Sequence, residues 1–125
     1  MCIARLKYME VQPNQDLLNK FSYFIIEFLI SRGLTQVRNA CLCHGIYGNI
    51  EVIRRIMQMD ILSEKDKNQC PNLESFECSL FENRNDLYMG FCRDFKTDIF
   101  MTGLSGIFYS ILREDVTSLP SILVS

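Results

Sequence analysis

Two side chains that bind transition metals well stand next to each other near the middle of the chain. Residues 39–50 read NACLCHGIYGNI, with Cys43 and His44 just ahead of two glycines. A cysteine thiolate and a neutral imidazole make a good pair of zinc ligands. Adjacent side chains on a regular helix point about 100° apart, whereas in the loop before a helix both can converge on one ion. The pair therefore indicates a candidate zinc site at Cys43 and His44.

The pair is incomplete as a zinc site, because a catalytic zinc ion usually takes three protein ligands and keeps one position open. His44 is the only histidine in the chain, which excludes a site with two histidines. The remaining cysteines show no Cys-x-x-Cys spacing, so packing is the expected role for most of them. They are Cys2, Cys41, Cys70, Cys78 and Cys92. If a helix starts just after the pair, its N-terminus is expected to lower the pKa of the Cys43 thiol.

Size, composition and charge narrow the possible functions. The 125 residues fit one domain, and 48% hydrophobic with 22% charged residues is typical of a globular protein. The net charge of −2, with both signs mixed along the chain, argues against nucleic acid or an anionic membrane surface as a partner. The sequence also contains no phosphate-binding loop, no Gly-x-Ser-x-Gly elbow and no His-Glu-x-x-His motif.

The chain is expected to be cytoplasmic and to have no transmembrane segment. Met1 leads directly into mixed sequence, with no apolar core and cleavage site of a secretory signal. The most apolar stretch, residues 21–30 (FSYFIIEFLI), contains Glu27, and a membrane span needs about 20 residues. Without a signal sequence, the cysteines are better interpreted as free thiols or metal ligands than as disulfides.

Apolar residues at spacings of three, four and seven predict three helices. We expect them at residues 13–33, at residues 45–59 and from about Thr102 onward. Their apolar faces are Leu17, Leu18, Phe21, Phe24, Ile25, Phe28 and Leu29; Ile46, Ile50, Ile53 and Met57; and Leu104, Ile107, Phe108, Ile111 and Leu112. The polar side chains expected to face outward on the second helix are Glu51, Arg54 and Arg55.

The second and third predicted helices begin alike. Residues 45–53 and residues 103–111 both start with Gly-x-x-Gly and continue as an apolar helix. Glycines at positions i and i+3 share a helix face, so each first turn is expected to pack tightly against a neighbouring element. The similarity indicates a long helical repeat.

The remaining segments carry weaker patterns. Residues 2–10 are expected to be the end of another helix, and residues 60–82 a long irregular loop with one helical turn. One short β-hairpin is expected around residues 87–95. Residues 118–125 (SLPSILVS) are expected to be extended because of Pro120.

Two of these motifs resemble a known family. LCHGIYGNIEVI resembles the second zinc-ligand motif of the lanthionine cyclases, and TGLSGIFYSILR followed by LPSILVS is similar to their C-terminal motif. Together they resemble the C-terminal part of a class II lanthionine synthetase, which dehydrates Ser and Thr of a precursor peptide and then closes thioether rings. The resemblance implies an all-α fold in which residues 1–125 form a single incomplete cyclase-like domain, part of an α/α toroid of helical hairpins.

The same resemblance implies a zinc site that this chain completes only in part. In the family, zinc is held by the pair that is here Cys43 and His44 and by a cysteine of an upstream Cys-x-Gly-x-x-Gly segment. The open position takes the peptide cysteine, whose thiolate adds to dehydroalanine or dehydrobutyrine. Residues 4–6 (ARL) match the helix after that segment, so the third ligand is expected before Met1 and is not Cys2. The acid/base residues of the family also lie upstream, so no catalytic residue is assigned here.

Two functions remain open from the sequence. In the first, the chain is a partial cyclase that is inactive alone, with a lanthipeptide precursor peptide and a complementary synthetase fragment as partners. In the second, it is a small non-catalytic helical interaction module. Cys43 and His44 are then core residues, and the glycines serve only close packing.

Overall fold

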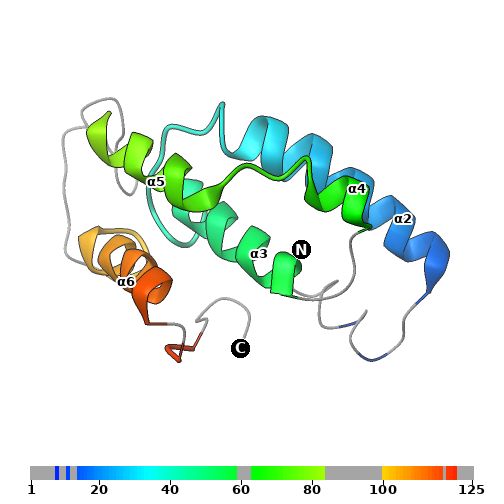
Figure 1. The fold of residues 1–125 in the computed structure, drawn as a ribbon. Coiled ribbons are helices and arrows are strands. Elements are labelled where there is room, and N and C mark those ends of the chain that lie inside the picture. The colour runs from blue at the N-terminus through cyan, green and yellow to red at the C-terminus, as the bar shows by residue number, and fades with distance from the viewer. Residues whose placement is uncertain are drawn as a thin grey trace.

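The computed structural model describes Tyr8, Val11 and residues 14–58, 63–83, 100–116 and 118–120. Its elements are α2 (Gln15–Phe24), the π-helix η1 (Ile25–Gly33), α3 (Ile46–Gln58), α4 (Glu64–Lys67), α5 (Leu73–Glu82) and α6 (Leu104–Asp115) (Figure 1). These ranges contain helices and no strand, which confirms the all-α class. The expected β-hairpin at 87–95 and the last five residues lie outside the described part, as does the expected helix end at 2–10 apart from Tyr8, which is helical. No described helix is both long and apolar enough to cross a membrane.

The first predicted helix is confirmed as α2, which continues directly into η1. Asn14 caps its start, because its Oδ1 accepts a hydrogen bond of 3.0 Å from the N–H of Asp16. The second half has the wider turn of a π-helix, whose backbone hydrogen bonds span five residues. A side-chain contact follows the same spacing, since Ser31 Oγ donates to the carbonyl of Ile26 at 2.9 Å. The predicted end at Gly33 is also confirmed.

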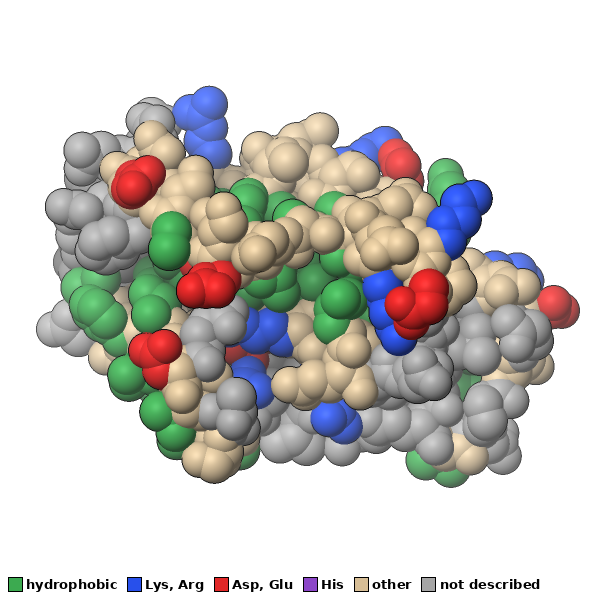
Figure 2. All heavy atoms as spheres, in the orientation of Figure 1, with side chains coloured by type: hydrophobic (Ala, Val, Ile, Leu, Met, Phe, Trp, Pro, Cys, Tyr) green, Lys and Arg blue, Asp and Glu red, His purple; other side chains and the backbone are tan. Residues whose placement is uncertain are grey.

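The helix α3 is the centre of the fold, between the α2–η1 segment and α6 (Figure 1). The buried apolar side chains of these three elements form the core; they include Phe21, Ile25, Leu29, Ile46, Ile50, Ile53, Ile56 and Ile107. Four predicted members of the apolar faces are instead exposed, namely Phe28, Met57, Phe108 and Leu112. The last two lie on α6, the side of the molecule where Figure 2 shows hydrophobic side chains at the surface.

The segment predicted to be an irregular loop with one helical turn contains two helices: α4 is a single turn of four residues, but α5 has ten, so the prediction of a loop was wrong for α5. Ser63 caps α4 by accepting a hydrogen bond from the N–H of Asp66. Asn72 caps α5, since its Oδ1 accepts from the N–H of Ser75 at 3.0 Å. The helix α5 packs against the core through Leu73, Phe76 and Leu80. These apolar residues are too few among charged neighbours to give a clear helical period.

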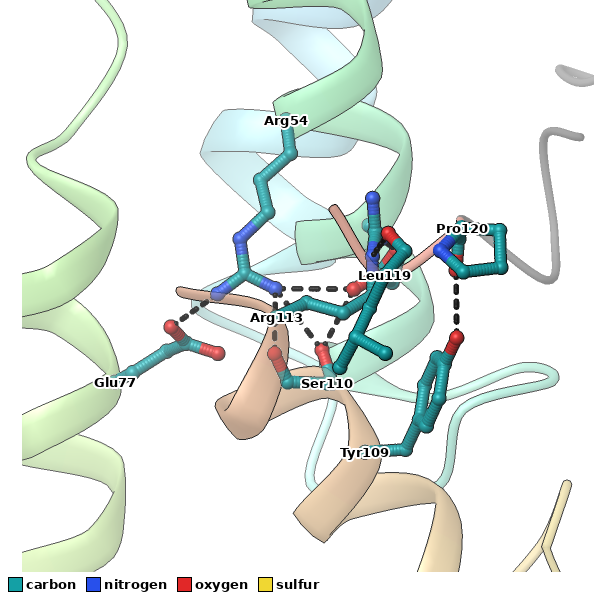
Figure 3. A network of polar contacts seen from close by, with 8 residues as sticks. Arg54, Glu77, Tyr109, Ser110, Arg113, Leu119 and Pro120 are labelled. Carbon is teal, nitrogen blue, oxygen red and sulfur yellow. Dashed lines mark hydrogen bonds and ion pairs between the residues drawn. The ribbon is translucent and has the colours of Figure 1, made fainter. Parts of the chain in front are cut away.

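A buried polar cluster joins α3, α5 and α6 (Figure 3). Arg54 of α3 lies 3.0 Å from the Glu51 carboxylate and 2.5 Å from that of Glu77 on α5. It also donates to the carbonyl and the hydroxyl of Ser110 on α6, each at 3.1 Å. The Ser110 hydroxyl in turn donates to Glu51 at 2.9 Å. The prediction that Glu51 and Arg54 face solvent was therefore wrong, because their side chains are 2% and 10% exposed. The polar side of α3 packs against two other helices, α5 and α6.

The cluster continues along α6 to the segment that follows it. Arg113 pairs with Glu51, and its Nε donates to the carbonyl of Leu119 at 3.2 Å. The Tyr109 hydroxyl donates to the carbonyl of Pro120 at 2.8 Å (Figure 3). These bonds hold residues 118–120 against α6, and through Glu51 they link the end of that helix to α3.

The buried phenol of Tyr47 on α3 gives a test of this packing. Its side chain is 3% exposed, and burial together with the Glu77 carboxylate raises the pKa of Tyr47 from 10.0 to about 12. The unfolded chain therefore releases this proton near pH 10, while the folded chain holds it up to about pH 12. Its contribution to stability is complete below pH 10 and is lost as the pH rises to about 12.

We expect the free energy of unfolding, measured with urea between about pH 9 and pH 12, to fall more gently in Tyr47→Phe than in the wild type. Tyr23→Phe removes an exposed phenol and should keep the wild-type slope. Parallel curves for the wild type and Tyr47→Phe would show that the Tyr47 phenol ionises as freely in the fold as in the unfolded chain.

Candidate metal centre

The Cys-His pair lies in a turn between η1 and α3, directly before α3, as the sequence predicts. We call residues 39–45 the ligand loop. In it, Cys43 Sγ lies 2.6 Å from His44 Nδ1 and 3.7 Å from Cys41 Sγ. The candidate ligand atoms of these three residues all lie within 4.8 Å of one another. The loop therefore brings together three side chains that can hold a metal ion.

Cys41 is the member of this group that the sequence did not single out. Its side chain is fully buried, in keeping with a packing role, but its sulfur lies beside that of Cys43. The signal was present as Cys-x-Cys-His, a spacing that converges only in a turn. Of the other described cysteines, Cys78 is exposed on α5 and Cys70 lies between α4 and α5, and neither belongs to the group.

Backbone hydrogen bonds hold the ligand loop against the start of α3. The N–H of Gly45 donates to the carbonyl of Cys41 at 3.0 Å, and the N–H of Ile46 donates to the carbonyl of Asn39 at 2.8 Å. The first N–H groups of a helix have no partner inside that helix, so the loop supplies the missing acceptors. A Cβ at Gly45 would overlap backbone atoms of Asn39 and Cys41. Only glycine fits at this position.

The sequence repeat corresponds to a repeat in the structure. A Cβ at Gly48 would overlap the carbonyl oxygen of Leu42, and one at Gly106 would overlap that of Phe100. In each case the blocked atom belongs to the residue six positions earlier, in the loop that leads into the helix. The glycines were expected to pack against a neighbouring element. Both first turns mainly make room for the loop before their own helix, and Gly106 in addition lies against Leu42 of the ligand loop, as expected.

The environment of Cys43 raises the pKa of its thiol above the ordinary value. Desolvation is the main cause, followed by the hydrogen bond and charge interaction with Cys41. The backbone N–H groups of Cys43 and His44 act in the opposite direction and are outweighed. The prediction that the helix start lowers this pKa was therefore wrong in its net sign. The Cys43 N–H also donates to the carbonyl of Met101 at 3.0 Å, which ties the loop to the segment before α6.

Asn39 positions the ring of His44 from beneath. Its side chain is buried, and its Oδ1 accepts from the N–H of Cys41 at 2.9 Å. Its Nδ2 therefore faces His44 Nε2, at 3.2 Å. An amide nitrogen only donates, so Nε2 accepts and Nδ1 carries the hydrogen toward the sulfur of Cys43. A metal at Nδ1 needs the other tautomer, which the exposed ring of His44 can adopt by turning away from Asn39.

Comparison with known proteins agrees with the motifs. The model of the family described as lanthionine synthetase C-like protein matches residues 1–124. The chain is also similar to the lacticin 481/lactococcin biosynthesis protein LcnDR2 of Lactococcus lactis subsp. lactis, with 27% identity over 121 residues. That alignment covers 90% of this chain and 13% of the relative, so the chain spans about an eighth of the relative's length. No solved structure matches the chain.

Because Gly45 is so closely packed, adding a single methyl group there is expected to destabilise the fold strongly. Gly45→Ala should lower the free energy of unfolding by at least about 2 kcal/mol, since the new Cβ meets backbone atoms that cannot move independently. Gly33→Ala is the control and should cost less, because there the nearest atom, at 2.8 Å, belongs to the Asn49 side chain and the nearest backbone atom, the Phe28 carbonyl oxygen, is at 3.2 Å. Equal costs of the two substitutions, measured by urea unfolding, would contradict the proposed packing of the loop.

Proposed function

Because this chain belongs to the lanthionine synthetase C-like family, we propose that it is part of a lanthipeptide-maturing cyclase in which Cys43 and His44 hold a zinc ion. The observation that carries the proposal is the approach of Cys43 Sγ to His44 Nδ1 at 2.6 Å in an exposed turn. Sulfur and imidazole nitrogen are donors that zinc prefers. The chemistry of the two side chains therefore fits the ion that the family motif implies.

When bound there, zinc would lower the pKa of a substrate cysteine thiol, so that the thiolate can add to dehydroalanine or dehydrobutyrine. The chain's own residues prepare the place for it. Cys43 and His44 are both exposed, so a peptide can approach them from solvent. The raised pKa of Cys43 keeps its thiol protonated in the metal-free loop, and binding therefore has to release that proton. The proposed partner is a lanthipeptide precursor peptide.

The complete reaction is proposed for a larger assembly, since the chain spans 13% of the length of its relative. Acid/base groups would then come from residues outside this chain, on the same polypeptide or on a complementary fragment. The chain alone is proposed to lack ring-closing activity. The four cysteines Cys41, Cys43, Cys70 and Cys78 are free thiols, which fits a reducing compartment, and we place the protein in the cytoplasm.

Zinc affinity of the full chain tests this proposal. We expect Cys43→Ala and His44→Ala each to weaken zinc binding by at least about tenfold, because loss of a direct ligand costs no less than loss of a supporting residue. Affinity would be measured by competition with a chromogenic chelator under reducing conditions. Cys78→Ala, which removes an exposed thiol on α5, should bind zinc as the wild type does.

Two results would contradict the proposal. One is a wild-type chain that is folded by circular dichroism and takes up no zinc. The other is an affinity that the substitutions at Cys43 and His44 leave unchanged. Either result would favour the non-catalytic helical module that the sequence left open.

A further inference from the structure

We propose that the groove between α5 and α6 docks a helix from the part of the synthetase that lies outside this chain. The docked helix carries an apolar stripe bordered by lysine or arginine. This inference rests on the proposed function, because it assumes that the chain works within a larger assembly. It adds the surface through which the chain joins that assembly and the chemistry of the element that binds there.

The groove lies between side chains of two neighbouring helices and encloses about 520 Å³. On one side, Glu74, Cys78 and Glu82 follow one another at four-residue spacing, so they share a face of α5. From Glu74 to Glu82 this row is about 12 Å long, at a rise of 1.5 Å per residue. Phe108 and Ile111 of α6 line the opposite side. A third helix can therefore lie along the groove for about two turns.

The α6 side of the groove belongs to a larger apolar stripe. Phe108, Ile111, Leu112 and Val116 fall at positions i, i+3, i+4 and i+8, which lie on one side of a helix. Phe108, Leu112 and Val116 are 55%, 52% and 43% exposed, although such a stripe normally packs against another element. The aligned relative is far longer than this chain, which covers 13% of it. The rest of a synthetase of that length can supply the covering helix.

The charges around the groove determine which kind of helix fits. Of the described lining residues, four are acidic and none is basic, and Figure 2 shows acidic side chains among hydrophobic ones where α5 and α6 lie. The charge of Glu77 is offset by Arg54, at 2.5 Å. The carboxylates of Glu74, Glu82 and Asp115 are exposed and form no ion pair within the described part of the chain.

An apolar groove with three such carboxylates on its borders is complementary to a helix that has lysine or arginine beside its apolar stripe. The long stems of these side chains also cover apolar surface while their charged ends reach the carboxylates. An acidic helix of the same shape would place like charges together and would be rejected.

A synthetic peptide that forms an amphipathic helix, with leucines on one face and lysines along its borders, is the probe for this surface. We expect the full wild-type chain to bind it at least about tenfold more tightly than the same peptide with glutamate in place of each lysine. Binding would be measured by fluorescence anisotropy. Phe108→Ser should weaken it at least about fivefold, because a central aromatic contact contributes strongly to such an interface. Tyr23→Ser, which removes an exposed aromatic side chain of α2, is the matched control and should bind as the wild type does.

Alkylation of Cys78 locates the bound peptide without any substitution. The Cys78 thiol is exposed and lines the groove, so the lysine peptide should slow its reaction with iodoacetamide, followed for each cysteine by mass spectrometry. The exposed thiol of Cys43 should react at its usual rate. Equal slowing of both thiols, slowing of Cys43 alone or slowing of neither would contradict docking in the groove.

The remaining outcomes distinguish this inference from its alternatives. Equal binding of the lysine and glutamate peptides, or binding that Phe108→Ser leaves unchanged, would overturn it. Self-association of the chain in sedimentation, abolished by Phe108→Ser, would also overturn it and make a second copy the occupant. Phe108→Ser should bind zinc as the wild type does. A chain that binds the lysine peptide at the groove and takes up no zinc would therefore support the docking surface and contradict the metal site alone.

Discussion

The close contact between the ligand loop and the first turn of α3 is the constraint on which the candidate site depends. The loop accepts hydrogen bonds from N–H groups that the helix itself cannot satisfy, at Gly45 and Ile46. That approach is possible because Gly45 and Gly48 have no side chain between the two backbones. The turn that results points Cys41, Cys43 and His44 to one place. The geometry of the ligands is thus set by backbone packing before any ion is considered.

The buried charged cluster around Arg54 bears on the candidate site through the packing of the helices. Arg54 contacts Glu51, Glu77 and Ser110, and so relates α3 to α5 and α6 at once. Buried ion pairs contribute little net stability compared with apolar packing, but they allow few alternative arrangements of their helices. Since Met101, just before α6, accepts the N–H of Cys43, the position of α6 also bears on the ligand loop.

The sequence predicted the elements whose apolar period is strong. It placed the first helical segment, α3 and α6 near their observed bounds, and it placed Cys43 and His44 before a helix. It did not predict that Glu51 is buried, because a single helix face cannot show that α5 and α6 cover the polar side of α3. The prediction from sequence also missed α5, whose start is marked mainly by the cap at Asn72.

The residues of the candidate site likewise fall into those that the sequence predicts and those that only the structure shows. A family motif identifies Cys43 and His44 from their order along the chain. Cys41 and Asn39 become visible only when the turn is folded, since their roles depend on which atoms the loop brings within contact distance. The net sign of the Cys43 pKa shift likewise depends on burial and on the neighbouring thiol, which outweigh the helix start that the sequence made evident.

Amide hydrogen exchange of the metal-free chain tests most directly whether the ligand loop is folded in advance. We expect the amides of Cys41, Cys43, Gly45 and Ile46 to exchange far more slowly than in an unstructured peptide, since each donates to an acceptor inside the protein. Exchange of these four amides at the unstructured rate, while the amide of Ile53 in α3 remains protected, would contradict it. The three candidate ligand side chains, Cys41, Cys43 and His44, would then not be brought together by the fold alone.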